Sequence, residues 1–154
     1  MGIFRGEKMK KEFIDIWLKT GALRNKQKDL EKIKSMIGSA EINAKVTRTI
    51  KLNDDTATLI FREIYESIRQ LGDAKWGILG FEPGNHEVSM EILKEFDIKN
   101  KVKLNSLDRF KKTRHDVNYR GLRTSINQAE EILDFWDKCG EEIIKFLRRD
   151  LKNK

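Results

Sequence analysis

The stretch ATLIFREIYESIRQL, residues 57–71, decides the fold class of this sequence. Its apolar residues recur at spacings of three and four, which places them on one face of an α-helix. Asn53 or Asp54 can cap the start of this helix, and the pattern continues through Trp76 to Leu79. The sequence therefore predicts a long helix, whose buried face carries Ala57, Ile60, Phe61, Ile64, Ile68 and Leu71.

Helical patterns of the same kind flank this segment on both sides. Residues 9–20 predict a short helix with an apolar side, and residues 30–44 predict a second one that is very basic. The first of these sides carries Met9, Phe13, Ile16 and Trp17, and the second carries Leu30, Ile33, Ile37, Ala40 and Ala44. Residues 1–24 are expected to form an N-terminal helical appendage that packs loosely or docks on a partner.

The second half of the chain continues the pattern. Pro83-Gly84 marks a loop over residues 80–87, where Asn85 can cap a short helix that covers about residues 87–96. Another helix is predicted to begin at Ser106, and Ser125 precedes the longest pattern, which runs to Leu151. Residues 1–154 are therefore predicted to form a single all-α domain, a bundle of four to six helices.

Composition agrees with this fold class and bounds the function. Charged residues make up 37% of the 154 and apolar residues 38%, with one proline, which favours helices over a sandwich or barrel. No apolar run approaches the roughly 20 residues of a membrane span, and the start lacks the apolar core of a signal peptide. Cys139 is alone, and two histidines lack zinc-ligand spacing. We expect a cytoplasmic protein without membrane, metal or cofactor.

The positive charge is concentrated in one segment. The net charge is +7, and residues 99–123 alone hold nine Lys and Arg against two Asp and Glu. Such clustering is typical of a surface that contacts phosphate or nucleic acid. Within it lies RFKKTRHDVNYRG, residues 109–121, followed by a long amphipathic helix.

This motif and its surroundings resemble the HEPN family (higher eukaryotes and prokaryotes nucleotide-binding domain). The resemblance covers roughly residues 53–152 and includes the long helix and the loop with His86 upstream of the motif. It implies an antiparallel helical bundle that forms a homodimer. Many members of the family are metal-independent ribonucleases, several of them toxins paired with a nucleotidyltransferase-type antitoxin, and others bind RNA or protein without catalysis.

Two registers of the family motif, an arginine followed by a histidine, fit this sequence. In the favoured one the arginine is Arg114, the next polar residue is His115, and Tyr119 stands where a ribonuclease carries histidine. The other pairs Arg109 with His115. Histidine suits proton transfer at neutral pH. A tyrosine is better suited to hydrogen bonding through its hydroxyl or to stacking through its ring. We therefore take Arg114, His115 and Tyr119 as the candidate catalytic residues.

The resemblance and the charge together predict a HEPN-like RNA-binding protein, with a toxin–antitoxin ribonuclease as its catalytic version. The alternative is a non-catalytic HEPN module that binds a nucleotide or a nucleotidyltransferase partner. Glu63 and Glu66 are expected to face inward and pair with Arg114 or Arg109. The candidate RNA-binding residues are Arg109, Lys111, Lys112, Asn118, Arg120 and Arg123.

Overall fold

The computed structural model describes residues 7–153, with side chains from residue 11 onward, and confirms the all-α prediction. Two short 3-10 turns cover Ile92–Glu95 and Lys101–Asn105. None of the described helices has the length and apolarity that crossing a membrane requires. The helices are α1 (Glu7–Thr20), α2 (Leu30–Thr47), α3 (Ala57–Leu79), α4 (His86–Glu91), α5 (Ser106–Arg120), α6 (Ile126–Phe135) and α7 (Glu141–Lys152), and the strands are β1 (Leu23–Asn25) and β2 (Phe81–Pro83).

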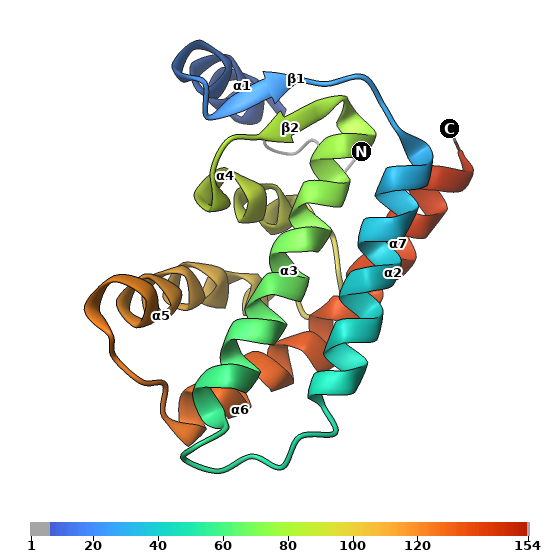
Figure 1. Cartoon of the computed structure of the whole chain (residues 1–154). Coiled ribbons are helices and arrows are strands. Elements are labelled where there is room, and N and C mark those ends of the chain that lie inside the picture. Colours follow the sequence, from blue (N-terminus) through green and yellow to red (C-terminus); the bar gives the residue numbers. More distant parts are fainter. Residues whose placement is uncertain (1–6, 154) are drawn as a thin grey trace.

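Helix α3 is the central element, and helices α2, α4, α5, α6 and α7 all pack against it. In Figure 1, α2 and α7 run along one side of α3, while α4 and α5 lie on the other. All six residues predicted for its buried face are buried, and so are Tyr65, Ala74 and Trp76. The buried surface of α3 is wider than a single stripe because it is covered from both sides.

Local sequence signals set the helix ends. The side chain of Asn53 accepts hydrogen bonds from the backbone N–H groups of Asp55 and Thr56, at 2.9 and 3.0 Å, just before α3 begins. Ser125 starts α6 with a capping box, in which its hydroxyl accepts from the Gln128 backbone and the Gln128 side chain accepts from the Ser125 backbone. The Ser125 capping box satisfies N–H groups that the first turn of α6 would leave unpaired. The N-cap of α3 is Thr56, whose side chain makes no capping hydrogen bond, so the predicted cap at Asn53 or Asp54 is wrong. Asn53 instead stabilises the turn before the helix.

The last helical pattern is interrupted, which the sequence did not predict. A π-helical turn at Trp136–Gly140 separates α6 from α7. A Cβ atom on Gly140 would lie only 2.7 Å from the indole ring of Trp136, so the ring packs directly over the glycine. A π turn contains an extra residue, which rotates the helix that follows it. The apolar stripe of α7 therefore faces the core, where Ile143 and Leu147 are buried.

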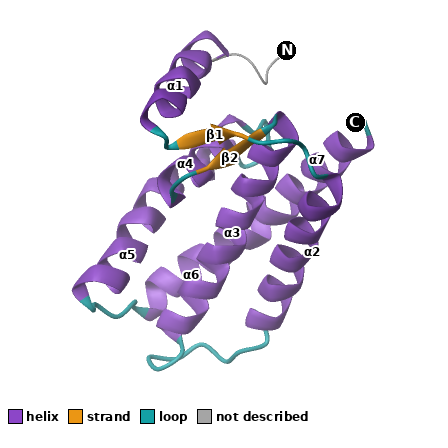
Figure 2. Cartoon of the chain, turned by 45° about the horizontal axis from the view of Figure 1, so that its top comes forward, coloured by secondary structure: helices purple, strands orange, loops and turns teal. Residues whose placement is uncertain are grey.

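The two short strands tie the N-terminal part of the chain to the loop after α3. Strand β1 pairs antiparallel with β2, with Leu23 opposite Pro83 and Asn25 opposite Phe81 (Figure 2). Leu23 is buried. Three-residue strands are too short to show an alternating pattern, so they could not be predicted from the sequence.

Helix α1 is anchored through a face that differs in part from the predicted one. Ile14, Trp17 and Leu18 pack against the core, and the Trp17 ring meets the edge of Trp76 at a centroid distance of 6.0 Å. Phe13 and Ile16, which the spacing places on the apolar side together with Trp17, are 45% and 53% exposed. The side chain of Met9 lies outside the described residues.

Helices α3 and α4 approach each other at Gly72. A Cβ atom there would lie 1.9 Å from the backbone carbonyl oxygen of Ser89, which no side chain can do. The absence of a side chain at this position therefore brings α4 against α3. This approach fixes where the first residues of α4, including His86, lie.

We predict that Gly72→Ala destabilises the protein by about 3 kcal/mol, because the methyl group must push α4 away from α3. Gly38→Ala in α2 is the matched control, since a Cβ atom there meets nothing within 4 Å. That change is expected to raise stability by about 0.5–1 kcal/mol through helix propensity. Urea unfolding of both variants measures the difference, and equal stabilities would refute the close approach.

Candidate functional site

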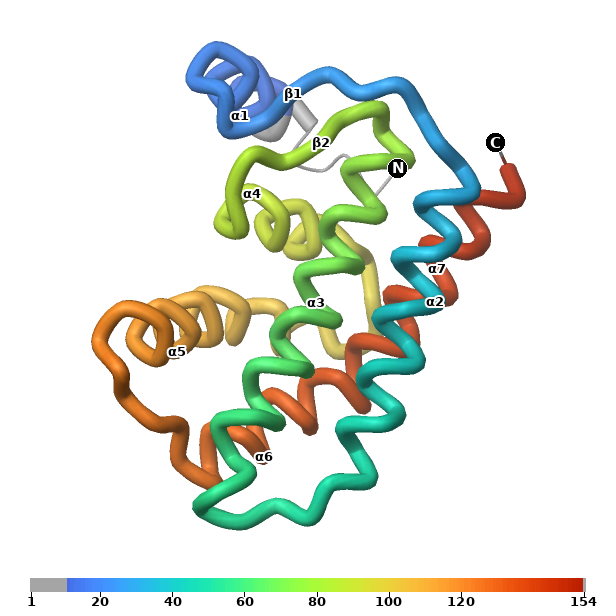
Figure 3. Tube along the Cα trace, in the orientation of Figure 1, coloured from blue at the N-terminus to red at the C-terminus, as the bar shows by residue number. Residues whose placement is uncertain are grey.

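An open cleft of about 750 Å³ lies between α4 and α5, with Tyr65 of α3 as its floor. Helices α4 and α5 lie on the same side of α3, as the trace in Figure 3 shows. The cleft receives polar and charged side chains from α5 and from the start of α4. Its lining residues are Tyr65, Asn85, His86, Glu87, Asp108, Lys111, Lys112, Arg114, His115, Asn118 and Tyr119.

The periodicity of α5 explains which of its residues enter the cleft. Leu107 and Phe110 are fully buried and face α3, where the Phe110 ring meets the edge of Phe61 at 6.1 Å. The same stripe continues at spacings of four and three through Arg114 and Val117, both half-buried. Arg114 therefore occupies a position that the helical pattern would give to an apolar residue.

The guanidinium group of Arg114 has no carboxylate partner among the described residues. Its Nε and Nη1 atoms are buried and make no hydrogen bond within residues 11–153. Its Cζ atom lies 5.6 Å from the centroid of the Tyr65 ring, a cation–π arrangement. A cation that is shielded from water and lacks a counter-ion destabilises a fold. This arrangement is the main anomaly of the cleft.

Tyr65 cannot supply the missing negative charge. Burial raises the pKa of its hydroxyl to about 12, although the nearby guanidinium of Arg114 acts in the opposite direction. The phenol is therefore neutral at physiological pH. Its ring offers Arg114 a polarisable face, and the positive charge remains available to an anion that enters the cleft.

The predicted acidic partners of Arg114 and Arg109 are elsewhere. Glu66 is bound to Arg69, whose Nε atom donates to the glutamate at 3.0 Å, and that hydrogen bond lowers the pKa of the Glu66 carboxyl. Glu63 is exposed. Arg109 forms a two-pronged ion pair with Glu131 of α6. The expectation that Glu63 or Glu66 pairs with Arg114 or Arg109 is therefore wrong.

The structure brings together part of the predicted site. The three candidate catalytic residues, Arg114, His115 and Tyr119, all line the cleft, as do Lys111, Lys112 and Asn118. Three further predicted RNA-binding residues lie outside it. Arg109 is held by Glu131, Arg120 lies near Asp116 at 3.9 Å, and Arg123 donates to the backbone carbonyl of Asp55 at 3.0 Å.

His86 is a cleft residue that the site predicted from the sequence did not include. It is the first residue of α4, directly after the cap Asn85, and it faces α5 across the cleft. His86 is exposed, yet the surrounding protein removes enough water to lower the pKa of its imidazole. The charges of Arg69 and Arg114 lower this pKa further, whereas those of Glu66 and Asp73 raise it. The nearby positive charges therefore favour a neutral imidazole.

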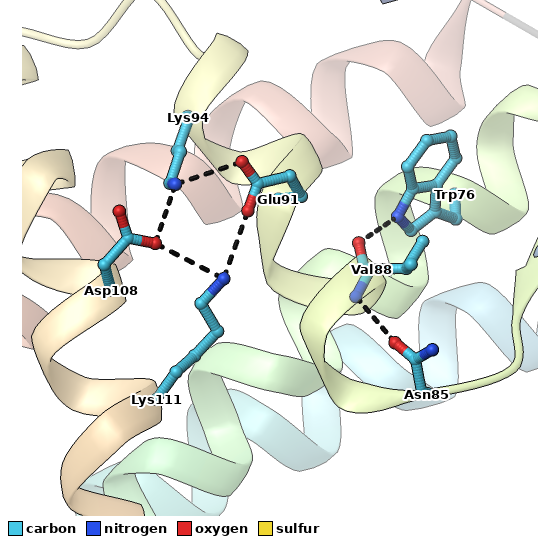
Figure 4. A network of polar contacts seen from close by, with 7 residues as sticks. All are labelled: Trp76, Asn85, Val88, Glu91, Lys94, Asp108 and Lys111. Atoms are coloured by element: carbon cyan, nitrogen blue, oxygen red, sulfur yellow. Dashed lines mark hydrogen bonds and ion pairs between the residues drawn. The ribbon is translucent and has the colours of Figure 1, made fainter. Parts of the chain in front are cut away.

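Helix α4 is held in place through both backbone groups of one residue. The Val88 N–H donates to the side-chain oxygen of Asn85 at 3.0 Å, and the Val88 carbonyl accepts from the indole nitrogen of Trp76 at 2.8 Å (Figure 4). Trp76 is fully buried in α3. This pair of hydrogen bonds anchors the short helix that carries His86 to the central helix.

A ring of four charges joins the segment around α4 to α5. Lys94 donates to Glu91 at 3.0 Å and to Asp108 at 2.8 Å, and Lys111 lies 3.1 and 3.3 Å from the same two carboxylates (Figure 4). Asp108 and Lys111 of this ring also line the cleft. Because its charges compensate each other, Lys111 has less to offer a ligand than Arg114 or the exposed Lys112.

The sequence matches no protein-family model, and neither a curated protein nor a solved structure is significantly similar to it. The relationship to the HEPN family therefore stays a prediction from the motif. The geometry of the cleft carries the functional argument below.

We predict that His86 titrates below its ordinary pKa of 6.5. Since the folded state disfavours the imidazolium ion, the contribution of His86 to stability is complete above pH 6.5 and declines as the pH falls. Arg114→Met removes one neighbouring cation and should raise the titration midpoint. NMR titration of the imidazole C–H resonances measures this, with Arg120→Met as a control that leaves the midpoint unchanged. A midpoint at or above 6.5 in the unmodified protein would contradict the account.

Proposed function

We propose that this protein binds RNA through the cleft between α4 and α5, with Arg114 as the residue that receives a phosphate group. The observation that carries the proposal is the half-buried guanidinium, whose buried Nε and Nη1 atoms make no hydrogen bond with the described residues. The charge of Arg114 helps to lower the pKa of the Glu66 carboxyl, but that carboxylate is bound to Arg69. The planar guanidinium group matches phosphate oxygens with paired N–H donors. A phosphodiester would thus complete an arrangement that the protein alone leaves unsatisfied.

A structural role for Arg114 explains the arrangement less well. Its contact with the protein is the face of the Tyr65 ring, which an unbranched apolar side chain would cover equally well. Keeping a charge at this position costs stability, and such costs are typically retained where function requires them. Lys112 of α5 also lines the cleft and adds a second cation, whose ammonium group lies 3.4 Å from the carboxylate of Asp116.

Metal-independent RNA cleavage is the second candidate function, favoured by two histidines that line the same cleft as Arg114. The ribose 2′-hydroxyl attacks the adjacent phosphorus, and neutral His86 accepts its proton. The bond to the 5′-oxygen breaks, and an imidazolium at His115 donates a proton to that leaving group. Arg114 stabilises the extra negative charge on the phosphorane. The products are a 2′,3′-cyclic phosphate and a 5′-hydroxyl.

Assembly and partners follow from the HEPN resemblance. We extend the proposal to a homodimer and to a nucleotidyltransferase-type partner, as expected for the toxin–antitoxin version. A non-catalytic module that binds a nucleotide or such a partner is the alternative. Light scattering of the purified protein distinguishes a monomer of about 18 kDa from a dimer of twice that mass.

We predict that Arg114→Met weakens RNA binding about 10-fold or more and leaves the folded state as stable as before or more stable. The loss follows from a charge-assisted hydrogen bond to phosphate, and the stability follows from removing an unpaired buried charge. The dependence of affinity on salt should also fall by about one phosphate contact. Fluorescence anisotropy at several salt concentrations and thermal unfolding measure the two effects.

Arg120→Met, the same change on the same helix outside the cleft, is the control and should alter affinity little. A large loss of stability in Arg114→Met with unchanged RNA affinity would show that the arginine is structural. Incubation with RNA in EDTA separates the two candidate functions. Fragments ending in cyclic phosphate that disappear in Arg114→Met and His86→Gln support cleavage, whereas intact RNA supports binding alone.

A further inference from the structure

A second cavity, of about 250 Å³, lies between the paired strands β1 and β2, the start of α2 and the second half of α3. It shares no lining residue with the cleft between α4 and α5. None of the residues proposed above to contact RNA lines it. The second cavity is therefore a separate site, and what it binds does not depend on the proposed function.

The second cavity has an apolar interior and a charged rim. Ile33 of α2 is buried, and Met36, Gly77 and Phe81 are half-buried. A Cβ atom on Gly77 would lie only 3.0 Å from the Ile33 side chain, so α2 and α3 approach each other closely here. The exposed lining residues, which form the rim, are Arg24, Lys26, Gln27, Asp29 and Lys32.

Two cations at the rim have no acid partner. Lys26 and Lys32 take part in none of the ion pairs among residues 11–153. The nearby acids are engaged elsewhere, since Asp29 accepts from the backbone N–H of Lys32 at 3.1 Å and Glu82 pairs with Arg24 at 2.9 Å. The rim can therefore bind an anionic group between its two free ammonium groups.

Asp73 of α3 brings a carboxylate to the buried part of the same cavity. Its Oδ2 atom accepts from Arg69, whereas its Oδ1 atom is shielded from water and makes no hydrogen bond within residues 11–153. Burial raises the pKa of this carboxyl, although the nearby Ser89 hydroxyl lowers it in part. That hydroxyl donates to the backbone carbonyl of Asn85 at 3.2 Å. A buried acceptor without a donor costs stability, which a ligand with an N–H group can recover.

We propose that the second cavity binds a small ω-amino acid, a linear compound with an amino group at one end and a carboxylate at the other. The amino group donates to Oδ1 of Asp73, the hydrocarbon chain contacts Ile33 and Met36, and the carboxylate lies at Lys26 and Lys32. Because the acceptor is buried and the cations are exposed, the ligand's apolar part must separate its two charged groups. The cavity is smaller than the roughly 300–1,000 Å³ of pockets for drug-sized molecules, so the ligand is short.

The test compares three compounds with the same hydrocarbon chain. 6-Aminohexanoate carries both charged groups, hexylamine lacks the carboxylate, and hexanoate lacks the amino group. Each is titrated into the unmodified protein while the methyl resonances of Ile33 and Met36 are followed by NMR. We expect 6-aminohexanoate to shift both signals and to bind about 10-fold or more tightly than either of the others, because each charged end adds a charge-assisted hydrogen bond.

Two variants assign the two ends of the ligand. Asp73→Asn should weaken the binding of 6-aminohexanoate and hexylamine about 10-fold and leave that of hexanoate unchanged. Lys26→Met combined with Lys32→Met should weaken 6-aminohexanoate and hexanoate and leave hexylamine unchanged. Lys28→Met is the control, because Lys28 is an exposed lysine of the same segment that does not line the cavity. Thermal unfolding verifies that Asp73→Asn is folded, and the lysine variant, at exposed positions, carries the test if it is not.

Three results would overturn the inference. They are methyl signals that none of the compounds shifts at millimolar concentration, equal affinity for all three compounds, and a Lys28→Met variant that weakens binding as much as the lysine pair does. The outcome is separate from that for RNA. Arg114→Met should bind 6-aminohexanoate as the unmodified protein does, and a failure to bind RNA would leave the second cavity unaffected.

Discussion

The contact between α3 and its neighbours on both sides is the constraint on which the rest of the structure depends. At Gly72 the backbone of α4 comes so close that no side chain fits, and at Trp76 the indole nitrogen holds the same segment by a hydrogen bond. Farther along α3, Phe61 receives Phe110 of α5. Both walls of the cleft are therefore positioned by one helix, and ion pairs of Glu91 and Lys94 with Asp108 and Lys111 also join the two walls to each other.

The cleft results from an exception in the pattern of α5. Two apolar residues bury the first half of that helix, and an arginine takes the next position of the stripe. Because Glu66 is already bound by Arg69, the acid expected to neutralise Arg114 is engaged elsewhere. Arg69 thus holds the carboxylate that would otherwise pair with Arg114. The positive charge of Arg114 is left for an anionic ligand to neutralise. A stable fold and a receptive site are in conflict at this residue.

Much of the fold could be predicted from the sequence because its signals are local. The buried face of α3 and the starts of α5 and α6 follow from helical spacing and from the cap at Ser125. The strands and the π turn could not be predicted. The strands are too short for a pattern, and the turn depends on Trp136 packing over Gly140.

The candidate site could be predicted only in part. The cluster of charge pointed to α5, which lines the cleft, and the spacing of Arg114 from Leu107 and Phe110 already implies that it faces inward. Which basic residues share one cleft depends on acids distant in the sequence, as the pairing of Arg109 with Glu131 shows. His86 was not among the predicted site residues, because its place opposite α5 is a product of tertiary packing that no local pattern records.

The central claim, that the guanidinium of Arg114 receives a phosphate, is tested most directly by NMR of the arginine Nε–H groups. The signal of Arg114 is assigned by its loss in Arg114→Met and followed as single-stranded RNA is added. The account predicts that this signal shifts progressively with RNA at low salt and returns as salt is raised. An Arg114 signal that stays in place while other arginines shift would contradict it.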